Sequence, residues 1–133
     1  MAQGKAAVIR SDLDIVIART LARDTAKSLG FGAIDQARIA TAVSELARNV
    51  FLYAGTGTVT VREVERGGRR GIEVICEDQG PGISSIDLVM QDGYSTSRGM
   101  GMGLPGAKRL MDEFEIRSQE GVGTTIICRK WRM

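Results

Sequence analysis

The sequence of 133 residues contains no histidine. This absence excludes Ser-His-Asp and Cys-His catalytic triads, zinc sites with histidine ligands and a histidine phosphoacceptor within the chain. Long apolar runs are also missing: the opening MAQGKAAVIR has no continuous apolar core, and no stretch approaches the length of a membrane span. The sequence therefore predicts neither a signal peptide nor a transmembrane helix.

The sequence also lacks a large excess of charge of one sign. It has 18 lysines and arginines and 16 aspartates and glutamates, which gives a net charge of +2. So small an excess does not indicate a nucleic-acid or membrane surface. Cysteine occurs only as Cys76 and Cys128, each within an apolar stretch. Without a secretory signal we expect two buried thiols in a cytoplasmic protein, and a disulfide or redox pair is the alternative.

The length suits a single domain, which we expect to span residues 1–133. A chain of this size, 43% hydrophobic, can bury most of its apolar surface and needs neither a disulfide nor a metal to fold. No internal repeat, low-complexity tract or linker divides the sequence.

Two helices are predicted in the first half of the chain, after a short strand at residues 5–10. Ser11 precedes an acidic first turn in a capping-box-like arrangement, and Gly30 is a natural stop for the first helix. A second helix is expected from Asp35 to about Tyr53, followed by glycines. Apolar residues recur at near-helical spacing in both helices: Leu13, Val16, Ile17, Thr20, Leu21 and Leu29 in the first, and Ile39, Val43, Leu46, Val50 and Phe51 in the second.

The pattern then changes to β-branched, partly alternating residues. Residues 58–64 and 71–77 are typical of two strands of a hairpin, joined by RGGRR at 66–70. The arginines of this segment are either a solvated hairpin tip or a binding site for an anionic partner. Three more elements are predicted: a helix at 104–111 and strands near 114–118 and 124–130.

This order of elements predicts an α+β fold, a two-layer α/β sandwich with a mixed, mostly antiparallel sheet and helices packed on one face. A long glycine-rich region runs from Gly80 to Gly106 and holds at most one short helix, near residues 83–90. Structureless stretches longer than about 12–15 residues are usually functional or disordered. Because glycine is costly in conformational entropy, so many glycines indicate close approach of the backbone to a bulky anionic ligand.

Three clusters could carry chemistry, and the first lies in the second predicted helix. Glu45 and Asn49 are four residues apart and therefore share one face of that helix. A carboxylate and an amide carbonyl placed in this way can position a nucleophile and offer an oxygen to Mg²⁺. The alternative is the polar flank of an amphipathic helix.

The second cluster, residues 78–82 (DQGPG), directly follows the predicted strand IEVICE. The carboxylate of Asp78 can accept a hydrogen bond from the exocyclic amine of a purine. Gly80 and Gly82 let the chain turn tightly beneath a base or sugar. An ordinary turn rich in Asp, Gly and Pro is the alternative.

The third cluster, residues 99–104 (GMGMGL), leads into a predicted helix. Backbone N–H groups at Gly99, Gly101 and Gly103, followed by a helix N-terminus at Leu104, form a cradle suited to a phosphate. The alternating glycines fit neither a Rossmann fingerprint nor a Walker loop. A flexible hinge is the alternative.

In this order the three clusters resemble the N box and the two glycine boxes of the GHKL superfamily of ATPases and kinases, which includes gyrase, Hsp90, histidine kinases and MutL. Gly123-Thr124 resembles the last motif of that superfamily, so the similarity covers nearly the whole chain. The resemblance implies the Bergerat fold, a glycine-rich ATP lid at roughly 91–105, and ATP and Mg²⁺ as cofactors.

Within the superfamily we expect no transducer domain and no dimerisation helix in this chain. The segments SELARNVFLYAG, EDQGPGI and DGYSTSRGMGMGLPGAKRLMDEF closely resemble the small protein-serine kinases of bacterial partner switching, above all the switch kinases of the stressosome. Related anti-sigma factor kinases, of the RsbW and SpoIIAB type, usually carry a histidine shortly after the N-box asparagine. This sequence has FLYAG there, which favours the switch kinases.

The resemblance implies a role for each candidate residue. Glu45 would be the catalytic residue that orients and partly deprotonates the attacking hydroxyl. Asp78 would hold the adenine amine with help from Thr124, and Asn49 would coordinate Mg²⁺ that bridges the phosphates. The cofactor-binding set is then Asn49, Asp78, Gly80, Gly82, Gly99, Gly101, Gly103, Leu104 and Thr124.

The resemblance also implies partners. The substrate would be a serine or threonine of a STAS-domain stressosome protein (RsbR- or RsbS-like), and the released kinase would bind and activate a PP2C-type phosphatase (RsbU-like). One alternative is an anti-sigma factor kinase that binds a sigma factor. Another is a plain ATP hydrolase in which Glu45 activates water. None of these activities involves nucleic acid or a membrane.

Overall fold

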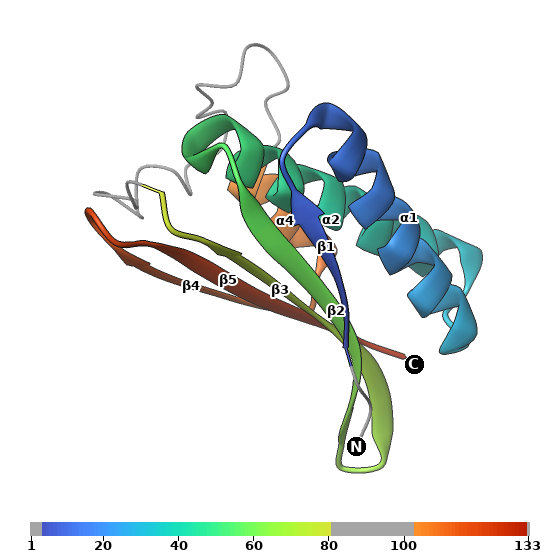
Figure 1. Cartoon of the computed structure of the whole chain (residues 1–133). Helices are drawn as coiled ribbons and strands as arrows, with labels where there is room; N and C mark the ends of the chain where they lie inside the picture. Colours follow the sequence, from blue (N-terminus) through green and yellow to red (C-terminus); the bar gives the residue numbers. More distant parts are fainter. Residues whose placement is uncertain (1–3, 81–102, 133) are drawn as a thin grey trace.

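The computed structural model describes residues 4–80 and 103–132, which form a twisted sheet with helices on one face (Figure 1). The elements are β1 (Lys5–Ile9), α1 (Asp12–Ser28), α2 (Ala33–Ala54), β2 (Gly57–Arg66), β3 (Arg69–Asp78), α4 (Gly103–Leu110), β4 (Glu113–Gln119) and β5 (Gly123–Trp131). The five strands lie in the order β1-β2-β3-β5-β4. The predicted α+β sandwich is confirmed, although every described strand pair is antiparallel, so this part of the sheet is not mixed.

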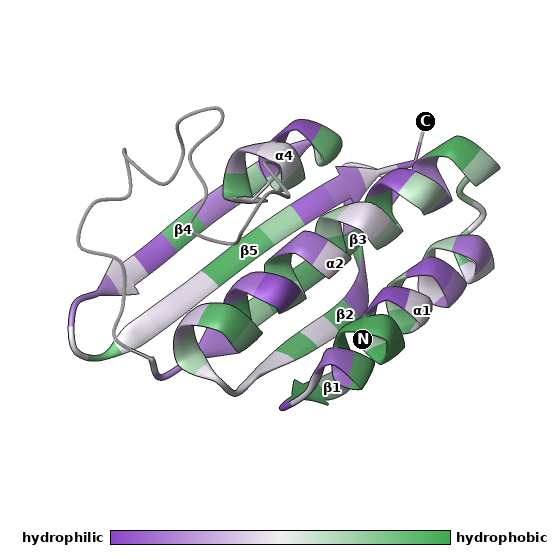
Figure 2. Cartoon of the chain, turned by 90° about the horizontal axis from the view of Figure 1, so that it is seen from above, coloured by the Kyte–Doolittle hydropathy of each residue, from purple (hydrophilic) through white to green (hydrophobic). Residues whose placement is uncertain are grey.

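The helices cover one face of the sheet side by side, as Figure 2 shows. Helix α1 lies over the β1–β2 edge, α2 over the centre, and α4 over the side formed by β5 and β4. Helix α2 packs against α1 and against α4. Within the described ranges, no helix is long and apolar enough to cross a membrane.

The start of α1 follows the predicted capping box. The Ser11 hydroxyl oxygen accepts a hydrogen bond from the backbone N–H of Asp14 at 3.4 Å. The Asp14 carboxylate in turn accepts hydrogen bonds from the backbone N–H of Arg10 at 2.9 Å and from the Ser11 hydroxyl at 3.1 Å. These contacts satisfy donors that the first turn of a helix leaves unpaired. After the other end of α1, Gly30 has a φ of +90°, which favours glycine.

The apolar face predicted for α1 is wrong in its first two turns. Leu13, Val16 and Ile17 are 66%, 44% and 48% exposed. The buried residues of the helix are Ile15, Ala18, Ala22 and Ala26. Because alanine side chains are short, they let α1 lie close to α2 and the sheet. In these two turns the predicted residues therefore lie on the solvent side, whereas Leu21 packs against the core and Leu29 is buried, as predicted.

The apolar face predicted for α2 is confirmed. Ile39, Val43, Leu46 and Val50 are buried, and Phe51 is partly buried against the same core. The helix begins two residues earlier than predicted, at Ala33, after the cap residue Gly32. It ends at Ala54, and the residue that follows, Gly55, has a φ of +81°, which suits glycine.

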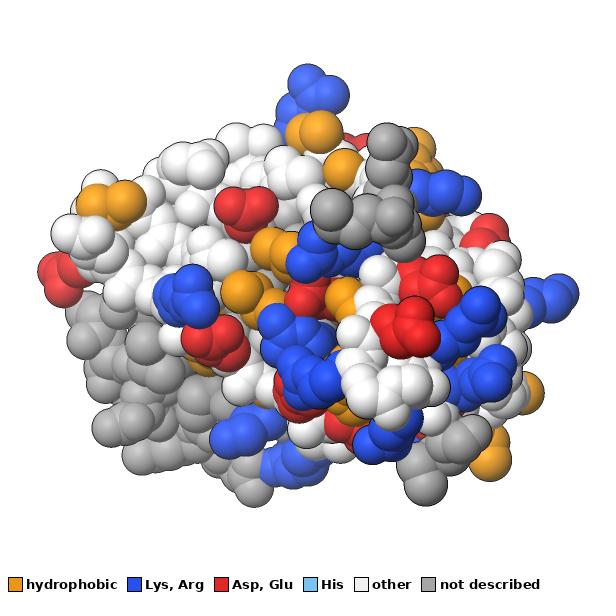
Figure 3. All heavy atoms as spheres, turned by 90° about the horizontal axis from the view of Figure 1, so that it is seen from below, with side chains coloured by type: hydrophobic (Ala, Val, Ile, Leu, Met, Phe, Trp, Pro, Cys, Tyr) orange, Lys and Arg blue, Asp and Glu red, His pale blue; other side chains and the backbone are white. Residues whose placement is uncertain are grey.

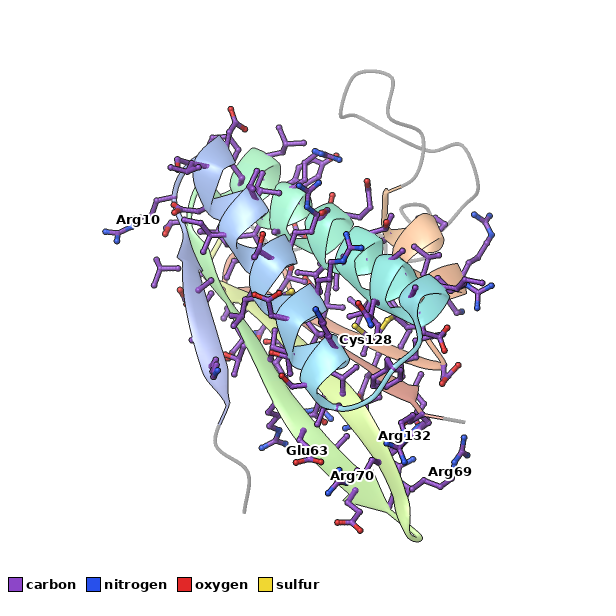
Figure 4. The ribbon with its side chains drawn as sticks, turned by 90° about the vertical axis from the view of Figure 1, so that its right-hand side faces the viewer. Arg10, Glu63, Arg69, Arg70, Cys128 and Arg132 are labelled. Atoms are coloured by element: carbon purple, nitrogen blue, oxygen red, sulfur yellow. The ribbon has the colours of Figure 1, made fainter. Side chains whose placement is uncertain are left out.

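The predicted hairpin is also confirmed, with a turn of two residues. Gly67 and Gly68 have φ values of +57° and +79°, as the favoured two-residue hairpin turn requires. Arg70 makes an ion pair with Glu63 at 3.3 Å, and Figure 4 shows both side chains near the end of the hairpin. Arg66 pairs with a carboxylate of β4 at 2.8 Å and lies over the Trp131 ring. These internal contacts favour a structural role for the hairpin arginines over the binding of an anionic partner.

The sheet face opposite the helices carries a buried carboxylate, that of Glu73. The Nε atoms of Arg62 and Arg129 donate to it at 2.5 and 2.6 Å, and Arg129 also donates to Glu113 at 3.0 Å. Figure 3, which looks onto this face, shows basic and acidic side chains gathered at its centre. The contacts join β2, β3, β5 and β4 across the sheet, which explains how a charged residue is accommodated at a central position of β3.

Cys76 and Cys128 are free, buried thiols, as expected. Burial raises the pKa of Cys128 to about 12 and the pKa of Cys76 well above its ordinary value. At pH 8 Cys128 is therefore a thiolate in only about one molecule in ten thousand, and the raised pKa of Cys76 also favours its thiol form. The thiolate is the reactive form.

We therefore expect the native protein to release no colour from Ellman's reagent at pH 8 over an hour, and two equivalents once guanidinium has unfolded it. Non-reducing mass spectrometry provides the control, because an intact disulfide would lower the mass of the unfolded chain by about two hydrogens. Rapid reaction of the native protein would show that at least one thiol is accessible and would contradict the burial.

Candidate functional site

The ends of β3 and β5 bring Asp78 and Thr124 together. The two residues are direct partners in the antiparallel register of these strands. Side chains two residues apart on a strand point to the same face, and Cys76 and Ile126 lie in the core beneath the helices. Asp78 and Thr124 therefore both point towards the helix layer, Asp78 partly exposed and Thr124 buried.

Ser118 on β4 orients the Thr124 hydroxyl, and sequence reasoning missed this residue. The Ser118 and Thr124 side-chain oxygens are 2.9 Å apart, and the Ser118 hydroxyl donates to the carbonyl of Gly123 at 3.1 Å. When Ser118 uses its proton in this way, Thr124 is the donor between the two hydroxyls. The Thr124 oxygen then retains a lone pair that can accept a hydrogen bond from a ligand.

The chain leaves β3 through a tight turn at Asp78. The backbone N–H of Gly80 donates to Oδ1 of Asp78 at 2.9 Å, which holds the carboxylate in one orientation. A Cβ atom at Gly80 would lie 2.6 Å from the Cβ of Ala54, so the turn packs tightly on the end of α2. Only glycine fits this position. The structure explains Gly80 by this packing, and its predicted contact with a nucleotide stays a prediction.

Helix α2 carries the first cluster, Glu45 and Asn49, one helical turn apart. The side chain of Glu45 is 8% exposed and makes an ion pair with Arg48 at 3.0 Å. Asn49 is partly buried. The last turn of the same helix contacts the Asp78–Gly80 turn through Ala54, so α2 ends beside the strand ends that carry Asp78 and Thr124. Glu45 and Asn49 therefore lie on the helix whose C-terminal end reaches Asp78 and Thr124.

Helix α4 begins at Gly103, one residue before the predicted start. Gly103 has a φ of +50°, and Leu104 is buried in the core beside α2. Leu104 thus anchors the first turn of α4, and its predicted contact with a nucleotide stays a prediction. The other predicted ligands Gly82, Gly99 and Gly101, the short helix near 83–90 and most of the lid at 91–105 lie outside the described residues.

The described part of the chain contains no group of three or more His, Cys, Asp or Glu residues that could hold a metal ion. Mg²⁺ commonly binds through one or two protein oxygens together with substrate phosphates and water. The side-chain amide oxygen of the partly buried Asn49 is a donor of this kind. The residues present therefore fit a magnesium ion that arrives with a phosphate ligand.

Comparisons with known proteins identify the family to which the chain belongs. Residues 34–132 match the family described as Histidine kinase-, DNA gyrase B-, and HSP90-like ATPase. The chain is 58% identical over 123 residues to serine/threonine-protein kinase RsbT of Bacillus subtilis (strain 168), with 92% of both chains covered. It is 33% identical over 120 residues to the anti-sigma F factor of Thermoanaerobacter sp. (strain X514), covering 86% of this chain and 82% of that protein.

The fold is similar to that of a mycobacterial sensor histidine kinase, MprB, with a TM-score of 0.57, 17% identity and 99% of both chains covered. At that identity the likeness concerns the fold alone. The family match includes the helix with Glu45 and Asn49, the end of β3 with Asp78, and Thr124 on β5. The resemblance to the GHKL superfamily is thus confirmed, and the chain belongs to the histidine kinase-, DNA gyrase B- and HSP90-like ATPase family.

Proposed function

We propose that the protein is an ATP-dependent protein serine/threonine kinase of a bacterial partner-switching pathway. The observation that carries this proposal is the 58% identity to a serine/threonine-protein kinase over 92% of the chain. The geometry supports it, because Asp78 and Thr124 are paired where β3 ends and β5 begins. The buried carboxylate of Glu45 lies on α2, whose last turn contacts the turn after β3.

In this proposal Asp78 at the end of β3 and Thr124 at the start of β5 recognise adenine. Oδ1 of Asp78 is occupied by the Gly80 N–H, so Oδ2 accepts a hydrogen bond from the adenine amine. The lone pair of the Thr124 hydroxyl assists, directly or through a water molecule. A carboxylate that must accept two hydrogen bonds distinguishes an amine from a carbonyl at this position of the base, which predicts a preference for ATP over GTP.

Transfer of the phosphoryl group depends mainly on positioning and on neutralisation of charge. Asn49 would hold Mg²⁺, which supplies positive charge beside the phosphates when it is bound. Backbone N–H groups, among them that of Gly103, would contact the phosphates. Glu45 would orient the hydroxyl of the acceptor serine or threonine and accept its proton as the oxygen bonds to the γ-phosphorus and ADP departs.

The acceptor we propose is a STAS-domain protein of a stressosome, RsbR- or RsbS-like, and the second partner a PP2C-type phosphatase, RsbU-like, that the released kinase activates by binding. The support is the relationship to RsbT and to anti-sigma F factors. We further propose that residues 1–133 form one domain and that the protein works in the cytoplasm, where its two free thiols stay reduced.

The direct test is to incubate the protein with ATP labelled on the γ-phosphate, Mg²⁺ and a purified STAS-domain protein. We expect label on a serine or threonine of the STAS protein, identified by phosphopeptide mass spectrometry. A STAS protein with that residue replaced by alanine is the control and should stay unlabelled. Full binding of ATP with no label on any STAS protein would contradict the kinase proposal.

An anti-sigma factor kinase is the second candidate, favoured by the 33% identity to an anti-sigma F factor. Gel filtration with Mg·ATP or Mg·ADP, in the presence of a sigma factor and a STAS-domain protein, separates the two candidates. The switch-kinase proposal predicts a complex with the STAS protein alone. A nucleotide-dependent complex with the sigma factor would replace it by the second candidate.

A further inference from the structure

The carboxylate of Glu45 has a charged partner on its own helix. Nη1 of Arg48 lies 3.0 Å from Oε1 of Glu45, and the two residues are three positions apart on α2. The Glu45 side chain is 8% exposed and the Arg48 side chain 31% exposed. A carboxylate removed from water in this way depends on its partner far more than an exposed one does.

A second ion pair with the same spacing lies on the same helix and serves as a comparison for the Glu45–Arg48 pair. Nη1 of Arg38 is 3.2 Å from Oδ1 of Asp35, with side-chain exposures of 53% and 26%. Each partner is more exposed than its counterpart in the Glu45–Arg48 pair, so water screens this second pair more strongly. The Glu45–Arg48 pair has the same geometry but places its carboxylate inside the protein, at the residue to which the proposed function gives the catalytic role.

We propose that Arg48 is a positioning residue for Glu45, whose guanidinium fixes the carboxylate through Oε1 and presents Oε2 to the attacking hydroxyl. This inference rests on the proposed function. A glutamate side chain has three rotatable bonds, and a base must lie within hydrogen-bond reach of the proton that it accepts. Because one oxygen is tied to Arg48, the orientation is set before the acceptor arrives and is not lost to rotation at the moment of transfer.

The proposal separates positioning from the binding of phosphate. An arginine that contacts the phosphates of ATP would, when removed, raise KM for ATP. An arginine that orients only the base would lower kcat for transfer and leave KM for ATP unchanged. The two roles of Arg48 therefore predict different kinetic changes in the same variant.

The experiment compares Arg48→Met, Arg48→Lys and Arg38→Met in steady-state transfer to the STAS-domain acceptor. We expect Arg48→Met to lower kcat by about tenfold or more with KM for ATP within about twofold, since a misplaced base loses most of its effect. Arg48→Lys should recover kcat to within about threefold of wild type, because the ammonium group can still pair with Oε1. Arg38→Met, the matched control on the same helix, should behave as wild type.

The double variant Glu45→Gln/Arg48→Met tests whether the two residues act as a unit. It should be no slower than Glu45→Gln alone, because Arg48 acts only through Glu45. Equal kcat for Arg48→Met and Arg38→Met, or additive losses in the double variant, would overturn the proposal. A raised KM for ATP with unchanged kcat would overturn it in favour of a phosphate ligand.

A measurement without an acceptor keeps this result distinct from a failure of the proposed function. In nitrogen-15 spectra the Arg48 guanidinium should show hindered rotation in the wild type and free rotation in Glu45→Gln, whereas Arg38 should rotate freely in both. Free rotation of Arg48 in the wild type would overturn the inference. Wild-type transfer by Glu45→Gln would instead remove the catalytic role of Glu45 from the proposed function.

Discussion

Replacing Glu45 by alanine is expected to lower phosphoryl transfer by about 100-fold or more, in line with the 10²–10⁴ that a positioned general base contributes. The affinity for ATP should stay within about threefold of wild type, because the proposed adenine contacts lie at Asp78 and Thr124, beyond the end of α2. Quench-flow measurement of transfer, beside calorimetric titration with ATP, separates the two quantities.

The control for this variant is Asp35→Ala, which removes a more exposed carboxylate from the first turn of the same helix. It should transfer phosphate at the wild-type rate. Thermal unfolding of both variants shows whether the loss of the buried carboxylate has disturbed the fold. Unchanged transfer by folded Glu45→Ala would mean that the base lies elsewhere, and lost ATP binding would mean that Glu45 belongs to the binding site.

Replacing Asp78 by asparagine is expected to weaken ATP binding by about 100-fold or more. A site built to form a hydrogen bond with its ligand loses much of its affinity when one of the two partners can no longer form that bond. The carboxylate has two acceptor oxygens, and one already receives the Gly80 N–H at 2.9 Å. An asparagine amide has one acceptor oxygen and one donor nitrogen. If its oxygen keeps the Gly80 contact, its NH₂ group faces the adenine amine, and two donors oppose each other.

Glu77→Gln is the matched control for Asp78→Asn. Glu77 is the preceding residue on β3, it is exposed, and its side chain points to the opposite face of the sheet. The loss of charge is the same, so calorimetric titration should give wild-type affinity for ATP. Wild-type affinity in Asp78→Asn as well would remove Asp78 from the adenine site.

Most of the fold could be predicted from the sequence because local signals agreed with one another. The Gly67-Gly68 turn, flanked by alternating β-branched residues, specified the hairpin, and the capping box at Ser11 specified the start of α1. The buried side of α1 could not be predicted in the same way. Its core residues are mainly alanines, whose weak hydrophobicity is hidden by the exposed Leu13, Val16 and Ile17. Tertiary packing, rather than periodicity, selected the face.

The candidate site was predictable where its residues belong to a local motif. Spacing alone places Asp78 at a strand end and Glu45 with Asn49 on one helix face, whereas their roles in a nucleotide site come from the resemblance to the GHKL superfamily. Ser118 was missed because its contact with Thr124 depends on the register between β4 and β5, which spacing along the chain does not show until the turn is known. The pairing of Arg48 with a buried partner likewise depends on how deeply Glu45 is buried.

The central claim is that the protein is a protein kinase, and the fate of the γ-phosphate tests it most directly. A protein kinase and an ATP hydrolase could share every contact with ATP proposed above, so binding of ATP does not distinguish them. The measurement follows labelled ATP in one reaction with the STAS-domain protein and in another without it, and counts label on protein and in free phosphate. We predict label on the STAS protein at a rate far above the release of free phosphate, and almost no turnover without the acceptor. Steady release of free phosphate, equal in both reactions and with no labelled protein, would contradict the kinase proposal and assign Glu45 to the activation of water.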